Sequence, residues 1–312
     1  MLSTQISPAI GSHLQSEEFT FSWAYFWLAT GGLLLILVVL AFAYLLVRAQ
    51  RARAQRLASS PFVRNLDLFL SNHARWLWTF VRRRLALAKW HGMALTMAAV
   101  ITLSAVYVFA LVTESWIEQE ALYAFDLRIY GWLIEAADSR MVDFMRNITR
   151  LGSRPTITAV STIAALILLA YRRWWHITSL VLAVGAGTGF MHGLQWIFER
   201  SRPVEQVINA AGHSFPSGHA FMATTLYGWL IFLTWRLVRS DLVRILATIV
   251  LTILIFIIGL SRVVLRVHWV SDVVGGFAVG LAWLVFSLVL TQILHSHYGG
   301  RTVAKKRDSP IA

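Results

Sequence analysis

The chain has 312 residues, of which 57% are hydrophobic and 14% are charged, with a mean hydropathy of +0.63 and a formal net charge of +13. This composition excludes an ordinary soluble domain, and the absence of cysteine excludes disulfide bonds and cysteine-ligated zinc. The positive charge fits membrane topology better than nucleic acid binding, because of its distribution along the chain, so we expect no nucleic acid partner.

Seven apolar stretches approach or exceed the roughly 20 residues that a helix needs to cross a bilayer. They are rich in Leu, Ile, Val and Ala and show no alternation, so they predict helices and not the strands of a barrel. In chain order the predicted spans are Trp23–Val47, Gly92–Val112, Thr156–Tyr171, Trp174–Phe198, His219–Val238, Arg244–Leu260 and Val273–Leu294. The predicted fold class is all-α, a polytopic membrane helix bundle.

The predicted organisation has three parts. Residues 1–91 would hold an N-terminal transmembrane helix and a cytoplasmic interfacial segment, because residues 62–90 mix aromatic side chains with arginines. Residues 92–295 would form a six-helix core, and residues 296–312 a basic cytoplasmic tail. The stretch 114–154 on the predicted outer side looks amphipathic, and we expect it to lie on the outer surface beside the functional site.

The loops between the predicted helices fall into two sets that differ in positive charge. One side of the membrane receives 19 of the 28 Lys and Arg residues and three acidic residues, whereas the other side receives nine Arg and twelve acidic residues. By the positive-inside rule, the first side is cytoplasmic. We therefore expect an integral membrane protein whose N-terminus lies outside and whose C-terminus is cytoplasmic.

Three polar stretches fall at helix ends on the predicted outer side. Gln195–Pro203 closes the fourth predicted helix, Phe215–His219 opens the fifth, and Ser261–Asp272 joins the sixth to the seventh. Because the alternation of the helices alone places the three stretches on the same face, we expect their side chains to converge.

The second stretch predicts an anion site at the start of a helix. Pro216 suits the first helical position, where a missing N–H group costs nothing. The backbone amides of Ser217, Gly218 and His219 would then be free donors at the positive end of the helix. Gly218 would allow a ligand to approach the backbone closely.

The first and third stretches contribute side chains that suit phosphate chemistry. The planar guanidinium groups of Arg202 and Arg262 match phosphate oxygens. His268 and Asp272 would share a helix face if that segment is helical, so that the carboxylate could hold one imidazole nitrogen and leave the other free to attack. His219 is a second imidazole that could donate a proton to a leaving oxygen.

These stretches resemble the signature of the type-2 phosphatidic acid phosphatase superfamily of membrane lipid phosphatases, whose site design is shared with vanadium haloperoxidases and acid phosphatases. The pattern is Lys, six residues, Arg-Pro; then Pro-Ser-Gly-His; then Ser-Arg, five residues, His, three residues, Asp. The second and third parts match fully at Pro216–His219 and Ser261–Asp272, and the resemblance covers about residues 120–295. The first part departs from the pattern, because Gln195 stands where the family has lysine, and one charge is lost.

The resemblance implies a role for each matching residue. His268 would be the nucleophile that forms a phosphohistidine, Asp272 would orient it, and His219 would protonate the leaving group. The phosphate oxygens would be bound by Gln195, Arg202, Ser217, Gly218 and Arg262. The resemblance implies no metal and no other cofactor, and Arg200 or Arg266 could replace the charge that is missing at position 195.

The predicted function is the hydrolysis of a membrane lipid phosphate or diphosphate, with undecaprenyl diphosphate as first choice by analogy with bacterial relatives. Phosphatidylglycerophosphate, phosphatidic acid and lipid A stay open as substrates, as do a lipid phosphotransferase and a non-catalytic lipid-phosphate binder. The same analogy indicates a bacterial inner membrane with the site on the periplasmic or outer face. The sequence predicts no oligomeric state.

Two other enzyme classes fit the sequence poorly. A zinc site built from His213, His219 and His268 is disfavoured, because the chain has neither a His-Glu-x-x-His motif nor a cysteine pair. A rhomboid-type serine protease is disfavoured as well, because Phe215 stands where the first glycine of Gly-x-Ser-Gly would be required.

Overall fold

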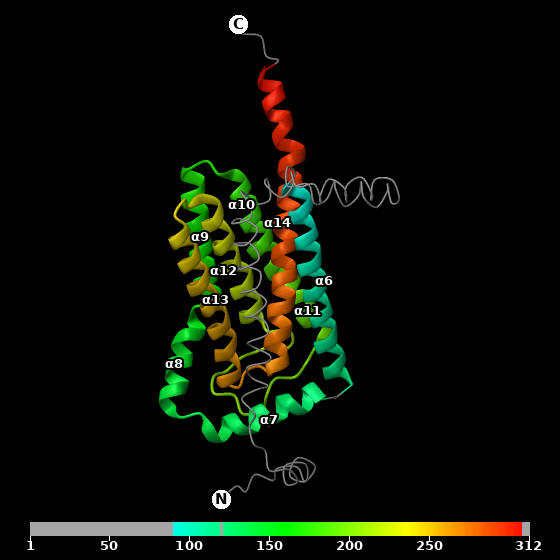
Figure 1. Ribbon diagram of the computed structural model, residues 1–312. Helices are drawn as coiled ribbons and strands as arrows, with labels where there is room; N and C mark the ends of the chain where they lie inside the picture. The colour runs from blue at the N-terminus through cyan, green and yellow to red at the C-terminus, as the bar shows by residue number, and fades with distance from the viewer. Residues whose placement is uncertain (1–89, 119–120, 308–312) are drawn as a thin grey trace, which may run out of the picture. The chain divides into compact units, whose positions relative to one another are not determined.

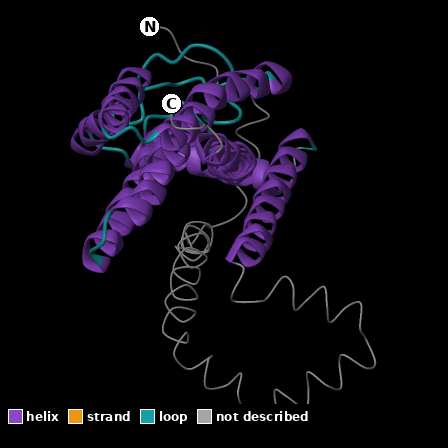
Figure 2. Ribbon diagram, turned by 90° about the horizontal axis from the view of Figure 1, so that it is seen from above, coloured by secondary structure: helices purple, strands orange, loops and turns teal. Residues whose placement is uncertain are grey.

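The structure is a computed structural model that describes residues 90–118 and 121–307, which form a bundle of helices (Figures 1 and 2). No strand occurs among these residues, and the predicted all-α membrane fold is confirmed. The predicted helix Trp23–Val47 and nearly all of the predicted interfacial segment lie outside the described residues.

Five of the described stretches are long and apolar enough to cross a membrane. They are Leu95–Ile117, Ser139–Ala170, Trp174–Phe198, Asp241–Val264 and Val270–His297. The corresponding helices are α6 (Trp90–Ile117), α8 (Ser139–Arg150) with α9 (Arg154–Ala170), α10 with α11 (described below), α13 (Asp241–Val264) and α14 (Val270–Arg307). The protein is therefore an integral membrane protein.

Helix α12 (Gly218–Leu237) is the sixth helix of the core and lies between α13 and α14, against which it packs (Figure 1). It buries Phe221, Leu226 and Trp229 completely. Because protein and not lipid surrounds this helix, it can carry polar residues such as Thr224 and Thr225, which are also buried. This explains why α12 is not among the five most apolar stretches.

The ends of the predicted spans differ from the observed helices. The predicted Gly92–Val112 extends in the structure to Trp90–Ile117, and the predicted Val273–Leu294 extends to Val270–Arg307. Most of the segment predicted as a separate basic tail thus continues α14. An apolar stretch marks only the lipid-facing length of a helix, and polar residues beyond it can keep helical backbone geometry.

The fourth span is interrupted. It consists of α10 (Trp174–Leu180), the π-helical turn η1 (Val181–Ala186) and α11 (Gly187–Phe198). A π-turn displaces carbonyl groups from the regular helical ladder. The indole N–H of Trp283 on α14 donates to the carbonyl oxygens of Leu182 at 3.2 Å and Ala183 at 3.1 Å, so these groups are satisfied inside the bundle.

Two helices occupy the stretch that was expected to be amphipathic. Helix α7 (Ala121–Ala136) buries Asp126, Ile129 and Leu133, which lie on one face, and α8 (Ser139–Arg150) follows it. Both lie at one end of the bundle, opposite the C-terminal end of α14 (Figure 1). The three polar stretches gather at the end where α7 and α8 lie.

Candidate active site

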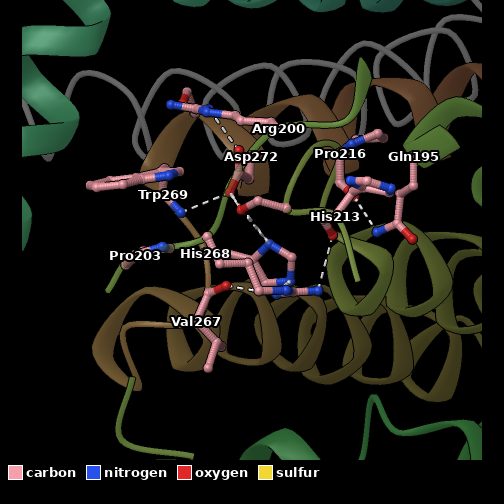
Figure 3. A network of polar contacts seen from close by, with 12 residues as sticks. Gln195, Arg200, Pro203, His213, Pro216, Val267, His268, Trp269 and Asp272 are labelled. Atoms are coloured by element: carbon pink, nitrogen blue, oxygen red, sulfur yellow. Dashed lines mark hydrogen bonds and ion pairs between the residues drawn. The ribbon is translucent and has the colours of Figure 1, made fainter. Parts of the chain in front are cut away.

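Side-chain and backbone contacts join the three polar stretches (Figure 3). Arg202 of the first stretch places Nη1 3.0 Å from Nε2 of His268 and donates to the carbonyl oxygen of Val267 at 2.7 Å, both in the third stretch. The backbone N–H of Ser217, in the second stretch, donates to the carbonyl oxygen of Asp272 at 2.9 Å. The convergence expected from the alternation of the helices is therefore present.

His268 and Asp272 meet at the start of α14, and not along one helix face. The condition for a shared helix face, a helical segment from His268 to Asp272, is not met, because α14 begins at Val270 and His268 precedes it. Asp272 lies in the first turn, and its Oδ2 accepts a hydrogen bond from the backbone N–H of Trp269 at 2.9 Å. This is the backward contact of a capping box, and it brings Oδ2 to 3.4 Å from Nδ1 of His268.

The partners of His268 define its tautomer. The Asp272 carboxylate next to Nδ1 favours a proton on that nitrogen, so Nε2 carries the lone pair and accepts from Arg202. Burial lowers the pKa of His268 to about 4, although Asp272 acts in the opposite direction. The imidazole is therefore neutral near pH 7 and presents Nε2 as a nucleophile.

Arg202 also organises the loop that follows it. Nε donates to the carbonyl oxygen of Gly212 at 2.9 Å, and Nη2 donates to those of Ala211 at 3.3 Å and His213 at 3.0 Å. These backbone contacts fix the guanidinium group against Nε2 of His268. A phosphate group bound to that nitrogen would meet the guanidinium directly.

The start of α12 differs from the prediction in two respects. The helix begins at Gly218 with Ser217 as N-cap, so Pro216 precedes the cap and is not the first helical residue. The amide of Ser217 is not free, because it donates to Asp272. The amides of Gly218 and His219 stay in the first turn, where no carbonyl group four residues earlier can pair with them. The hydroxyl of Ser217 is buried and lacks a hydrogen-bond partner among the described residues.

Arg262, near the end of α13, is buried and faces the same region. Its Nη1 donates to Oγ1 of Thr149, at the end of α8, at 2.8 Å, whereas its Nε is buried and has no partner among the described residues. The turn that follows α8 packs on His219, since a Cβ added at Gly152 would lie 3.1 Å from its Cδ2. Sequence reasoning noted the stretch that contains Thr149 and gave this residue no role.

Gln195 lies beside the turn Pro216–His219, which was predicted to bind an anion, but brings no charge to it. Its Nε2 donates to the carbonyl oxygen of Pro216 at 3.0 Å. Neither arginine that could have replaced the charge is available. Arg200 is paired with two carboxylates, and Arg266 lies 3.6 Å from Glu205 in a left-handed backbone conformation.

A buried ion-pair network supports Asp272 (Figure 3). Arg200 Nη1 lies 2.6 Å from Asp272 Oδ1 and donates to Oγ of Ser271 at 2.7 Å, while Nη2 lies 2.9 Å from Oδ2 of Asp126 on α7. The hydroxyl of Ser214 donates to Asp272 Oδ2. Both oxygens of Asp272 are thus engaged, so the carboxylate has a fixed orientation toward His268.

Sequence reasoning missed most of this network. Arg200 was considered only as a replacement charge, although its position two residues before Arg202 placed it near the site. Asp126 carried a usable signal, because it is an acidic residue on the buried face of α7, beside Ile129 and Leu133. Nothing in the sequence around Ser214 indicated its contact with Asp272.

Residues 177–295, which contain all three polar stretches, match the PAP2 superfamily. These residues therefore form a PAP2 superfamily domain, and the protein is a membrane lipid phosphatase. As a PAP2 phosphatase it is a hydrolase that acts on phosphate esters.

Three PAP2-type proteins show the extent of the likeness. Phosphatidylglycerophosphatase B of Bacillus subtilis strain 168 is 29% identical over 185 residues, which cover 59% of this chain and 90% of the relative. YbjG of Escherichia coli strain K12, a candidate undecaprenyl-diphosphatase, is 29% identical over 183 residues, or 54% of this chain and 84% of the relative. The crystal structure of a transmembrane PAP2-type phosphatidylglycerolphosphate phosphatase from Bacillus subtilis matches with a TM-score of 0.57 and 25% identity, over 61% of this chain and 96% of that chain.

Replacing Gln195 with lysine is expected to strengthen inhibition by vanadate, a phosphate analogue, by about tenfold, because a charge-assisted hydrogen bond is stronger than a neutral one. Gln195→Ala should weaken the inhibition by about threefold or less, since only a neutral donor is lost. The measurement is the vanadate concentration that halves phosphate release by each purified variant.

Gln292→Lys is the matched control for this experiment, because Gln292 lies in the second half of α14, where it accepts a hydrogen bond from Arg236 at the end of α12. It should leave vanadate inhibition unchanged. An unstable Gln195→Lys protein, together with unchanged inhibition of Gln195→Ala, would remove Gln195 from the phosphate site.

Proposed function

We propose that this PAP2 phosphatase hydrolyses an isoprenyl diphosphate, with undecaprenyl diphosphate as first choice, through a phosphohistidine and without a metal ion. The observation that carries the mechanism is the pair of contacts of His268. Nδ1 faces the anchored carboxylate of Asp272, while Nε2 faces the guanidinium group of Arg202. One imidazole is therefore oriented and placed against a phosphate-binding cation.

In the first step, Nε2 of His268 forms a bond to phosphorus as the bond from phosphorus to the leaving oxygen breaks. His219 donates a proton to that oxygen, and the Nδ1 proton of His268 stays on the hydrogen bond to Asp272, which stabilises the positive charge on the ring. In the second step, water attacks the phosphohistidine, and His219 accepts a proton from it. Inorganic phosphate leaves and His268 returns to its neutral form.

The proposed binding groups surround the transferred phosphate. The arginines Arg202 and Arg262 and the amides of Gly218 and His219 would contact its oxygens, and the buried hydroxyl of Ser217 would supply one more donor. Gln195 would contribute a neutral donor next to them. These groups bind the equatorial oxygens, where charge accumulates during phosphoryl transfer.

The choice of lipid is supported by the relatives. YbjG, a candidate undecaprenyl-diphosphatase, supports the diphosphate. Phosphatidylglycerophosphatase B, with its larger coverage, supports phosphatidylglycerophosphate as a second candidate. Phosphatidic acid and lipid A are weaker candidates, and a phosphotransferase would pass the phosphate to a lipid acceptor.

Phosphate release from a panel of lipids is the test of this proposal. The purified protein should release phosphate from undecaprenyl diphosphate faster than from phosphatidylglycerophosphate, phosphatidic acid or lipid A, without an added acceptor. EDTA should leave the rate unchanged, because arginines and amides take the place of a cation. Loss of activity in EDTA that zinc or magnesium restores would contradict the mechanism, and a requirement for a lipid acceptor would favour a phosphotransferase.

The proposed orientation places the site on the periplasmic or outer face of a bacterial inner membrane, with the C-terminus in the cytoplasm. The sorting of positive charge supports it. Because the chain lacks cysteine, single cysteines can report the orientation directly. In intact cells, a membrane-impermeant thiol reagent should label Ala211→Cys, near the site, and should not label Arg173→Cys, between α9 and α10. The reverse pattern would place the site in the cytoplasm.

A further inference from the structure

Arg154 is an exposed arginine that the proposed mechanism does not use. It is the first residue of α9, two residues after Gly152, which packs against His219. Its Nη2 lies 3.3 Å from Nε2 of His192 on α11, so the guanidinium group is directed across from α9 to α11.

The part of α11 that Arg154 reaches borders the start of α12. On α11, Met191 precedes His192 directly, and its Cε would lie 3.0 Å from a Cβ added at Gly218. One turn later on α11, Gln195 donates to the carbonyl oxygen of Pro216. Arg154 and His192 therefore lie at the rim of the anion-binding turn.

The turn that leads into Arg154 packs on His219 through Gly152, whereas Arg202 contacts His268. In phosphoryl transfer, the attacking atom and the leaving oxygen lie roughly in line on opposite sides of phosphorus. If His268 attacks and His219 protonates the leaving group, the leaving group lies on the side of the site that carries His219 and the start of α9.

The partners of Arg154 leave its charge uncompensated. Arg146, Arg200, Arg244 and Arg266 each pair with a carboxylate. Within the described ranges, 90–118 and 121–307, the structure shows no carboxylate paired with Arg154, whose hydrogen-bond partner is the imidazole of His192. An anionic group of a substrate would complete this pairing.

We propose that Arg154, positioned by His192, binds the leaving phosphate of a diphosphate substrate and makes the enzyme prefer lipid diphosphates to lipid monophosphates. When the bond between the two phosphates breaks, the bridging oxygen takes its proton from His219, and the departing phosphate keeps its other negative charges. Arg154 stabilises those charges. An alcohol leaving group carries no such charge, so Arg154 contributes little to monophosphate hydrolysis. This inference rests on the proposed roles of His268 and His219.

The test compares two substrates in one detergent. Arg154→Gln is expected to lower kcat/KM for farnesyl diphosphate by about 10- to 100-fold, and to change kcat/KM for phosphatidic acid by about threefold or less. Phosphatidic acid thus reports whether the variant is folded. Arg154→Lys should retain more diphosphate activity than Arg154→Gln, because the charge remains. His192→Leu should show a smaller loss that is also selective for the diphosphate.

Arg150→Gln is the matched control, because Arg150 is exposed and lies at the end of α8, four residues before Arg154. It should leave both rates unchanged. Equal losses on the two substrates in Arg154→Gln would assign Arg154 to the fold or to the transferred phosphate, and unchanged rates would leave it without a role. Either result overturns the proposal.

An inhibition assay distinguishes a failure of the proposed Arg154 subsite from a wrong choice of lipid substrate. Methylenediphosphonate, a diphosphate that cannot be hydrolysed at its bridge, should inhibit phosphatidic acid hydrolysis by the unmodified enzyme. Arg154→Gln should weaken that inhibition by about tenfold and leave vanadate inhibition unchanged. If the unmodified enzyme hydrolyses no lipid diphosphate, the proposed substrate is wrong, whereas this selective loss of inhibition would still support the subsite. Unchanged inhibition would overturn the subsite.

Discussion

Replacing His268 with alanine is expected to abolish phosphate release, because no other described nucleophile has both an orienting carboxylate and a facing arginine. The rate should fall by about 1,000-fold or more, the scale seen when a catalytic nucleophile is removed. The direct measurement is acid quenching of the unmodified enzyme with a substrate labelled in its phosphate. Label should be found on His268, and His268→Ala should trap none.

Asp272→Asn tests the second half of the same arrangement. The variant should still fold, although with lower stability. Its rate of phosphate release should fall by about 100-fold or more, because the amide cannot stabilise the charged imidazole. His213→Ala is the control, since Arg202 contacts only the backbone of His213 at this position. It should retain most activity. Full activity in His268→Ala would refute the assignment of the nucleophile.

Arg200→Met is expected to have the largest effect on stability. The side chain of Arg200 is 3% exposed, and those of Asp126 and Asp272 are 0% exposed, so its removal leaves two buried carboxylates without a counter-charge. Breaking such a buried pair lowers the free energy of unfolding by about 3–5 kcal/mol. The measurement is the midpoint of thermal unfolding in detergent micelles, together with the rate of phosphate release, which should be lost.

Two variants show whether the effect comes from the network. Arg146→Met removes an exposed ion pair, in which the side chain of Arg146 is 47% exposed and that of Asp143 is 69% exposed. Such pairs contribute about 0–1 kcal/mol to the free energy of unfolding. Asp126→Asn keeps the pair of Arg200 with Asp272, so it should destabilise less than Arg200→Met and keep some activity. Equal unfolding midpoints for Arg200→Met and Arg146→Met would show that the network contributes nothing to stability.

Much of the fold could be predicted from the sequence, because lipid requires long apolar helices and their alternation assigns loops to two sides. That reasoning placed the five described spans and α12, and it put the three polar stretches at one end. It could not find the π-turn in Val181–Ala186, since the residues there are as apolar as those of a regular helix. Nor could it place the end of α14, because helical geometry there continues past the apolar residues.

The candidate site was less predictable, because its contacts depend on the geometry of individual turns. Spacing alone allowed His268 and Asp272 to share a helix face only if the segment was helical, whereas a capping contact with the backbone of Trp269 brings them together. Spacing also could not show that Arg200 turns inward to Asp126, which lies 74 residues earlier in the chain. Such long-range pairs are set by packing of α7 on the core, which no local pattern encodes.

The π-turn between α10 and α11 has a consequence for how this protein tolerates insertions and deletions. A π-turn holds one residue more than a regular helical turn, and each residue in an α-helix rotates the chain by about 100°. A π-turn winds less per residue, so deleting one residue from Val181–Ala186 would restore a regular α-helix and leave α11 at nearly its present rotation relative to α10. Gln195 would then keep its contact with Pro216. Deleting a second residue would rotate α11 by about 100° and turn Gln195 away from α12. The substrate-facing side of α11 should therefore tolerate the loss of one residue in the membrane interior, whereas the loss of two should impair catalysis.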